Sequence, residues 1–283
     1  MIFETHAHLD GEEFDRDREE VLARIREEGV GHLVNIGADL KSSRRSVDLA
    51  RRYGWIYAAV GIHPEEIRDF YPSPGEGETG VDPNWEETAY GDQVLEQLRD
   101  LAQDARVVAI GEIGLDYYWV KDEKERRAQA YWFRRQLTLA GELGLPVVIH
   151  SREAARDTLA IMQEAAREGI RGVIHCYSYS RDQALQYVKM GFFIGVGGVV
   201  TFKNGRKLRE VVEAIPIESL VLETDSPYMS PEPRRGRRND PGNLPIIARQ
   251  IAQIKGISYD ELVRITQENA MRLYPEVEDD KTR

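Results

Sequence analysis

Cysteine is almost missing from this chain of 283 residues, in which Cys176 is the single example. No disulfide can therefore form within the chain, and any metal must be held by histidine and carboxylate side chains rather than by thiolates. Also missing are an apolar run near the roughly 18 residues of a membrane-spanning helix and the basic and apolar segments of a secretory signal. We therefore expect a cytoplasmic protein without a membrane partner.

Basic residues are outnumbered, because 38 lysines and arginines stand against 49 aspartates and glutamates and leave a formal net charge of −11. Proteins that bind nucleic acid usually carry basic surfaces. If a polyanion such as DNA is the substrate, it must be bound through a local basic patch and through metal ions. Nothing in the sequence indicates an obligate protein partner.

What the chain does contain is an alternation of short β-branched segments with longer amphipathic ones. The predicted strands are Ile2–Thr5, His32–Ile36, Ile56–Val60, Val107–Glu112, Pro146–His150, Gly172–His175, Phe192–Val196 and Leu220–Glu223. The clearest predicted helices are Phe14–Glu28, Leu40–Tyr53, Lys124–Leu143, Ala154–Glu168 and Arg181–Lys189. Two more helices are expected after the last strand, at Leu244–Lys255 and Ser258–Leu273. Eight strand-then-helix units predict an α/β fold, a parallel (β/α)8 TIM barrel. An open doubly wound sheet is the alternative, although no G-x-G-x-x-G follows the first strand.

The predicted domain organisation is simple. Residues 1–275 are expected to form one barrel domain, and residues 276–283 a charged C-terminal tail that frays. The segment Pro72–Asp92 is rich in glycine, proline and acidic residues, so we expect a long loop or a short irregular helix there.

Five of the six histidines lie at the C-terminal ends of predicted strands. They are His6, His8, His63, His150 and His175, and two acids, Glu112 and Asp225, occupy corresponding positions. Because these ends converge on one mouth of a parallel barrel, where catalytic groups sit, we expect a metal site there. A lone histidine of this kind is more often a buried, hydrogen-bonded residue, but five at matching positions are hard to explain by packing.

The spacing of His6 and His8 supports this interpretation, because alternate residues of a strand point the same way and can reach one ion together. Imidazole suits zinc, iron or nickel, whereas carboxylates bring in magnesium and manganese. The mixed set is therefore permissive about the metal. His-x-His alone is weak evidence, and it gains strength from the glutamate, histidines and aspartate at the other strand ends.

Taken together, these motifs resemble the TatD-type metal-dependent deoxyribonucleases of the amidohydrolase superfamily. The matching segments, in family order, are Thr5–Asp10, Gly61–Pro64, Gly111–Tyr117, Pro146–Arg152, His175–Ser178, Leu222–Tyr228 and Arg238–Asn243. They span nearly the whole chain. Two departures are Glu4, where the family usually has aspartate, and Tyr179, where it often has glycine.

The resemblance implies two divalent ions, Mg, Mn or Zn, and a role for each candidate ligand. His6 and His8 would bind the first ion with Asp225, and Glu112 would bridge both ions. The second ion would be bound by His150 and His175. His63 would contact the scissile phosphate or its water. Asp225 is the candidate base, so the catalytic residues would be Asp225, Glu112 and His63.

Other residues near the strand ends have two interpretations each. Glu223 could orient a ligand histidine or form an ion pair inside the barrel, and Asp116 could support Glu112 or cap a turn. Arg152 could bind phosphate or form a structural salt bridge. Tyr117, with its two aromatic neighbours, could stack on bases or pack. Four arginines could form a local site for an anionic substrate or a solvated loop: Arg234, Arg235, Arg237 and Arg238.

The resulting functional hypothesis is hydrolysis of a phosphodiester by a metal-activated water. The resemblance implies a deoxyribonuclease acting as a 3′–5′ exonuclease. One alternative is an amide or ester hydrolase of the amidohydrolase type, such as a D-aminoacyl-tRNA deacylase, which the same metal centre would serve. A weaker alternative is a non-enzymatic scaffold with a vestigial metal site.

Overall fold

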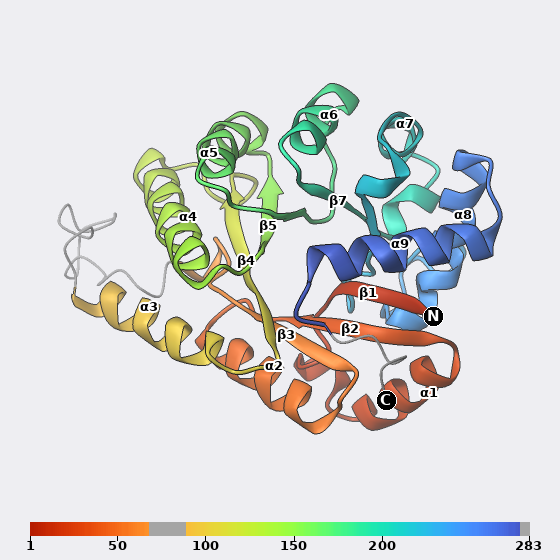
Figure 1. The fold of residues 1–283 in the computed structure, drawn as a ribbon, viewed down its shortest axis with the longest axis horizontal. Coiled ribbons are helices and arrows are strands. Elements are labelled where there is room, and N and C mark those ends of the chain that lie inside the picture. The colour runs from red at the N-terminus through yellow and green to blue at the C-terminus, as the bar shows by residue number, and fades with distance from the viewer. Residues whose placement is uncertain (68–88, 278–283) are drawn as a thin grey trace.

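The computed structural model describes residues 1–67 and 89–277, and its centre is an eight-stranded sheet, most of whose strands are labelled in Figure 1. All neighbouring strands pair in parallel and in chain order. The strands are β1 (Ile2–Ala7), β2 (Val30–Ile36), β3 (Ile56–Val60), β4 (Val107–Asp116), β5 (Val147–Arg152), β6 (Gly172–Ile174), β7 (Phe193–Val196) and β8 (Leu220–Leu222). The first and last strands also meet, through a bridge between Ala7 and Ser226 and a hydrogen bond from Thr5 Oγ1 to the carbonyl oxygen of Leu222. The predicted (β/α)8 barrel is confirmed.

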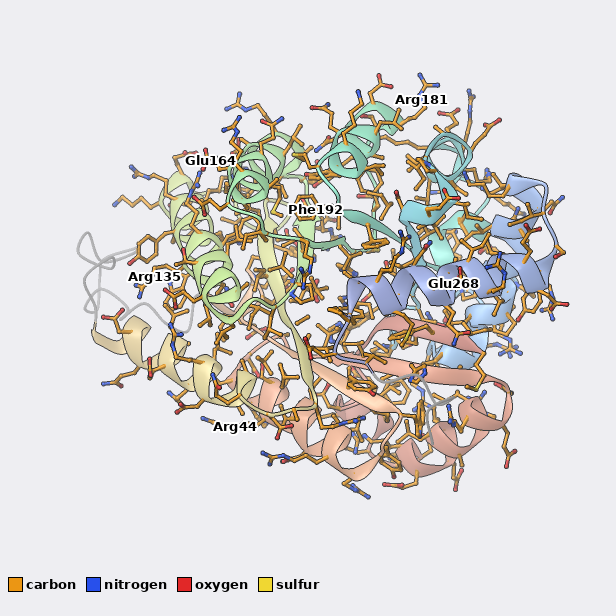
Figure 2. The ribbon with its side chains drawn as sticks, in the orientation of Figure 1. Arg44, Arg135, Glu164, Arg181, Phe192 and Glu268 are labelled. Carbon is orange, nitrogen blue, oxygen red and sulfur yellow. The ribbon has the colours of Figure 1, made fainter. Side chains whose placement is uncertain are left out.

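Helices cover the outside of the barrel. They are α1 (Arg18–Glu27), α2 (Leu40–Arg52), α3 (Ala89–Ala102), α4 (Glu123–Leu143), α5 (Ala155–Arg167), α6 (Arg181–Lys189), α7 (Arg206–Ala214), α8 (Leu244–Lys255) and α9 (Tyr259–Leu273). Their boundaries follow local chemistry: Asp39 caps α2 by accepting a hydrogen bond from the Ser42 N–H, and Gly144 ends α4 with a φ of 68°. Figure 2 shows charged side chains such as Arg44 and Arg181 projecting outward from these helices.

The two faces of each strand belong to two separate buried clusters. In β3, Ile56, Ala58 and Val60 pack against the helices, whereas Tyr57 and Ala59 belong to the second cluster, inside the barrel. This is the two-residue periodicity of a strand. Both faces are apolar because a parallel sheet in a barrel is buried on both sides.

The N-terminal end of the barrel is closed by the last residue of α9 and the chain that follows it. Leu273, Tyr274 and Val277 are buried in the interior cluster, where the Tyr274 ring stacks on Phe3 at 6.1 Å. The Tyr274 hydroxyl donates to the carbonyl oxygen of Thr5. With this end filled by side chains, the polar centre of the barrel lies at the opposite end, where the strands finish.

Two predicted segments lie largely outside the described residues, and one predicted strand is longer in the structure. Of the segment Pro72–Asp92, predicted as a long loop or a short irregular helix, the residues up to 88 lie outside the described part, and Ala89–Asp92 form the first turn of α3. Most of the predicted tail, 278–283, also lies outside it, but Val277 is buried and so belongs to the barrel. Strand β4 continues to Asp116, beyond the predicted end at Glu112.

Candidate metal centre and active site

The inner faces of the strands change from apolar to polar toward their C-terminal ends. On β5, Val148 of the interior cluster is followed two residues later by His150. After β6 and β8 the same step leads from Val173 to His175 and from Val221 to Glu223. The strand period therefore places the polar side chains in one layer at the mouth.

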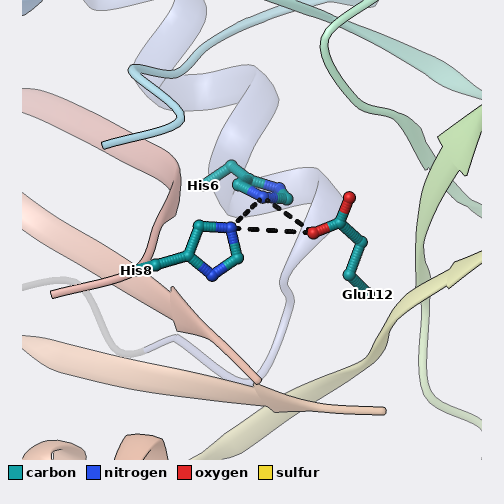
Figure 3. Close-up of side chains that lie close together, drawn as sticks. All are labelled: His6, His8 and Glu112. Atoms are coloured by element: carbon teal, nitrogen blue, oxygen red, sulfur yellow. Dashed lines mark hydrogen bonds and ion pairs between the residues drawn. The ribbon is translucent and has the colours of Figure 1, made fainter. Parts of the chain in front are cut away.

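His6 and His8 meet at the end of β1. Their Nε2 atoms lie 3.1 Å apart, and each faces Oε2 of Glu112 from β4, at 3.4 Å for His6 and 3.6 Å for His8 (Figure 3). His6 is buried, and the side chain of His8 is 17% exposed. The three side chains thus form a compact group of two nitrogens and one oxygen.

The other carboxylate oxygen of Glu112 faces a different set of histidines. Oε1 lies 2.8 Å from Nδ1 of His150, 3.0 Å from Nε2 of His175 and 3.7 Å from Nε2 of His63. The His6 and His175 rings stack with centroids 3.7 Å apart, so the two histidine sets touch beside Glu112. Glu112 is the one acid that contacts both sets through different oxygens among the ion pairs of the described residues.

Asp225 lies just beyond β8, in the left-handed region at φ 57°, and faces the first set. Its Oδ1 is 3.8 Å from Nε2 of His6 and 3.7 Å from Nε2 of His8. Its backbone N–H donates to the His6 carbonyl oxygen, which ties the β8 end to the β1 end. Burial raises the pKa of Asp225, but the contact with His8 and the charges of His175 and His6 outweigh burial and lower the pKa overall.

Neighbouring acceptors orient the histidine rings. Nδ1 of His8 is 2.9 Å from the Ile36 carbonyl oxygen, which leaves Nε2 free to act as a ligand. Nε2 of His150 is 3.1 Å from Oδ2 of Asp116. Asp116 also accepts hydrogen bonds from the N–H groups of Tyr118 and Trp119 through Oδ1, so it both supports a histidine and caps a turn.

Beneath the histidines lie two buried glutamates. Oε1 of Glu223 accepts a hydrogen bond from the Cys176 N–H and lies 3.7 Å from Nδ1 of His175, which places Glu223 beside a histidine of the second set. Glu4 accepts from the N–H groups of His6 and Thr224. Burial raises the pKa of Glu4 to about 8 and that of Glu223 to about 7.

Glu4 was not predicted as a site residue. Its signal was present in the sequence, because Glu4, His6 and His8 are spaced by two and so share a strand face. In the fold, Glu4 holds the backbone of His6 rather than facing the mouth directly, since its side chain is fully buried.

The donor set fits a cation. Two imidazole nitrogens 3.1 Å apart, with carboxylate oxygens of Glu112 and Asp225 within 4 Å, form a group that a divalent ion would hold together. The Nδ1 atoms of His6 and His175 and Oε2 of Glu223 are buried and have no hydrogen-bond partner in the described structure. Nitrogen and carboxylate donors of this mixture accept zinc, manganese or magnesium.

His63 follows β3 and completes the mouth. Its ring lies edge-on to His150 with centroids 4.3 Å apart, and burial together with the charge of His150 lowers the pKa of His63 to about 3. The ring is therefore neutral near pH 7. Nδ1 accepts a hydrogen bond from the Glu65 N–H, so Nε2 carries the proton.

Of two residues predicted to contact substrate, Tyr117 and Arg152, only Arg152 has an exposed side chain. Tyr117 is only 8% exposed, its hydroxyl donates to Asp157, and Arg126 covers its ring, so the structure places Tyr117 in the packing rather than at the mouth. Arg152, at the end of β5, is exposed, and its guanidinium lies 4.0 Å from the centre of the Tyr118 ring.

The arginine segment after β8 is an exposed loop without helix. Arg238 donates to both carboxylate oxygens of Asp17, and Arg234 donates to Asn243. Arg235 lies over the ring of Phe202. These contacts hold part of the loop against the barrel, although residues 233–238 remain exposed.

A (β/α)8 barrel whose mouth gathers histidines and carboxylates around shared oxygens defines the class of metal-dependent hydrolases. The family model described as TatD related DNase matches residues 3–275, and the chain belongs to this family. No helix in the described part of the chain is long and apolar enough to cross a membrane.

Individual relatives agree with this assignment. The chain is 39% identical over 274 residues to the "uncharacterized metal-dependent hydrolase YabD" of Bacillus subtilis, covering 97% of this chain and 99% of the relative. It is 33% identical to the 3′–5′ ssDNA/RNA exonuclease TatD of Cronobacter sakazakii, covering 96% and 97%. The crystal structure of the Escherichia coli TatD homologue YJJV superposes with a TM-score of 0.83 at 30% identity, covering 97% and 98%.

Proposed function

We propose that the chain is a two-metal nuclease that hydrolyses phosphodiester bonds of single-stranded nucleic acid from the 3′ end in the cytoplasm. One divalent ion, Mg, Mn or Zn, would be held by His6, His8 and Asp225, and a second by His150 and His175. Glu112 would bridge the two ions.

The proposal depends on one observation: the two carboxylate oxygens of Glu112 face two different sets of histidines. Its Oε2 faces His6 and His8, whereas its Oε1 faces His150 and His175. A carboxylate that serves one ion needs histidines on one side only. Two sets on two oxygens are the donor arrangement of a bridged pair of ions, which stabilises the attacking and leaving oxygens of a phosphoryl transfer when bound.

Asp225 would then accept a proton, and His63 would donate a hydrogen bond to the phosphate. The carboxylate of Asp225 is ionised near neutral pH, because its pKa is lowered, and it would accept the proton of the attacking water. Nε2–H of the neutral His63 donates to a nonbridging oxygen of the scissile phosphate. Arg152 and the four loop arginines bind flanking phosphates as charged donors.

The choice of substrate rests on the relatives. The Cronobacter sakazakii relative is named a 3′–5′ ssDNA/RNA exonuclease, and it matches this chain over nearly its full length. The electrostatics are compatible, since the acidic chain places Arg152 and the arginine loop at the end of the barrel where the ligands converge.

Product analysis tests the proposal. A 5′-labelled single-stranded oligonucleotide is incubated with the purified protein and Mg, Mn or Zn, with a chelator in parallel, and the products are resolved by length. We expect a ladder that shortens from the 3′ end and disappears with chelator. Intact oligonucleotide under every metal condition would overturn the nuclease assignment, and hydrolysis of acylated tRNA in the same samples would favour the deacylase alternative.

A further inference from the structure

Large apolar side chains are exposed at few places, and most of those places are at the mouth. Among the described residues, the exposed large hydrophobic side chains are Met1, Tyr118, Trp119, Tyr228 and Met229. Four of these five form two adjacent pairs, one after each of two strands that carry the site. Exposed apolar side chains gathered in this way mark a binding surface.

The two pairs stand on opposite sides of the metal centre. Tyr118 and Trp119 follow β4, whereas Tyr228 and Met229 follow β8. In a barrel with strands in the order β1 to β8 and contacts between β8 and β1, strands β4 and β8 are four positions apart in either direction. A chain that runs from one pair to the other therefore crosses the mouth where the histidines meet.

Each pair is tied to a residue of the centre. The N–H groups of Tyr118 and Trp119 donate to Oδ1 of Asp116, whose Oδ2 faces His150. On the other side, the Tyr228 N–H donates to the Asp225 carbonyl oxygen. The positions of both pairs relative to the ligands are thus set by hydrogen bonds of the fold.

The pair after β4 is already arranged as a stacking surface. The Tyr118 and Trp119 rings are perpendicular, at 88° with centroids 4.6 Å apart, and Trp119 is 59% exposed. The Arg152 guanidinium lies over both rings, at 4.0 Å and 5.8 Å from their centres. Aromatic faces combined with a cation bind nucleobases and an adjacent phosphate without sequence preference.

We propose that these two pairs bind unpaired nucleobases on opposite sides of the scissile phosphate. A base on the β4 side stacks on the more exposed Trp119 ring and meets Tyr118 edge-on, and Tyr228 with Met229 contacts a base on the β8 side. The inference rests on the proposed nuclease function and adds the residues that contact the bases of the substrate strand. A base held in a duplex is stacked on its neighbours and offers no free face, so these contacts select single strands.

The test removes the base and the ring separately. KM is measured for oligonucleotides that carry one abasic residue at successive positions from the 3′ end, with the metal-loaded wild type and with Tyr118→Ala/Trp119→Ala. Base–aromatic stacking predicts that a missing base at one position raises the wild-type KM by at least roughly fivefold. In the double variant KM for the complete oligonucleotide rises, and the penalty for the missing base at that position disappears. Tyr228→Ala should remove the penalty at a different position.

Matched variants separate stacking from folding. Tyr118→Phe/Trp119→Phe keeps aromatic faces and should retain the penalty. Trp55 precedes β3 at the closed end of the barrel and also lies near an arginine, with Arg26 5.4 Å from its ring centre, so Trp55→Ala should leave KM and the penalty unchanged. Melting temperatures verify that all variants fold.

The outcomes distinguish this inference from the proposed function. If the wild type cleaves oligonucleotides but no abasic position changes KM, or if the penalty persists in the alanine variants, the stacking surfaces are overturned while the nuclease stands. If the wild type cleaves no oligonucleotide, the nuclease assignment fails and the stacking inference fails with it.

Discussion

Nε2 of His6 and Nε2 of His8 lie 3.1 Å apart in the barrel mouth. Two imidazole nitrogens at this distance repel each other unless a proton or a cation lies between their lone pairs. Burial and the neighbouring His175 lower the pKa of His6 to about 4, so His6 is neutral near pH 7. For His8, burial lowers the pKa, but Asp225 and Glu112 outweigh burial and raise it to about 9. Without a metal, the pair therefore holds one proton, which a divalent ion must displace.

The first prediction is that metal binding releases protons and strengthens as pH rises. His8 and His150, whose pKa values are raised to about 9, are protonated below pH 9 and must lose that proton to bind an ion. Calorimetry in buffers of different ionisation enthalpy should detect proton release between pH 6 and 8, and the affinity should level off above about pH 9. Metal at 100 times Kd should stabilise the fold by about 2.7 kcal/mol.

The control for this prediction is His6→Ala/His8→Ala. This double variant should lose the shift in melting temperature caused by the first ion. Affinity that is independent of pH across this range would contradict the proton held between the histidines.

The second prediction concerns Glu112→Gln, which should weaken binding of both ions. The amide keeps one oxygen and cannot supply a charged oxygen to each histidine set, so counting of metal on the dialysed variant should give less than one ion per chain. Glu268→Gln, on the exposed face of α9, is a matched control that should bind as wild type. Loss of one ion with unchanged affinity for the other would show that Glu112 does not bridge.

The third prediction is that Asp225→Asn folds normally and hydrolyses oligonucleotides several orders of magnitude more slowly. An amide cannot accept the proton of the water, and loss of a general base alone costs roughly 10²–10⁴-fold. Rates at saturating metal and circular dichroism spectra provide the measurement, with Asp182→Asn on the exposed start of α6 as the control. Turnover near the wild-type rate in a folded variant would remove Asp225 from the mechanism.

The fourth prediction concerns the arginine loop. Replacing Arg234, Arg235, Arg237 and Arg238 by serine should raise KM for oligonucleotides and flatten its salt dependence. Each lost phosphate contact should reduce the salt slope of binding by roughly 0.7–0.9. Because Arg238 is already paired with Asp17, its single replacement should change the slope least.

A control for the loop variant is Arg44→Ser/Arg181→Ser, which removes exposed charges from α2 and α6 on the outer surface. This pair should leave the salt slope unchanged. An unchanged slope in the quadruple loop variant would mean that the loop is only a solvated part of the surface.

Local patterns were enough to predict most of the barrel. Strand β3 and helices α6 and α8 have the predicted boundaries, because apolar periodicity and turn residues act within a few positions. The mouth was predictable for the same reason, since the C-terminal ends of parallel strands must meet. Helix α3 was not among the clearest predicted helices. The predicted glycine- and acid-rich segment Pro72–Asp92 overlaps the first turn of α3.

The sequence by itself determined the order of the elements, the donor types at the strand ends and the family, because each depends on residues near one another in the chain. Only the tertiary structure decided which atoms of these side chains contact one another. Glu112 meets His150, 38 residues away, through one oxygen and meets His6 and His8 through the other. Arg238 pairs with Asp17 across 221 positions. Such contacts follow from how the closed barrel brings distant strand ends together, and no local pattern of residues encodes the distance between two atoms.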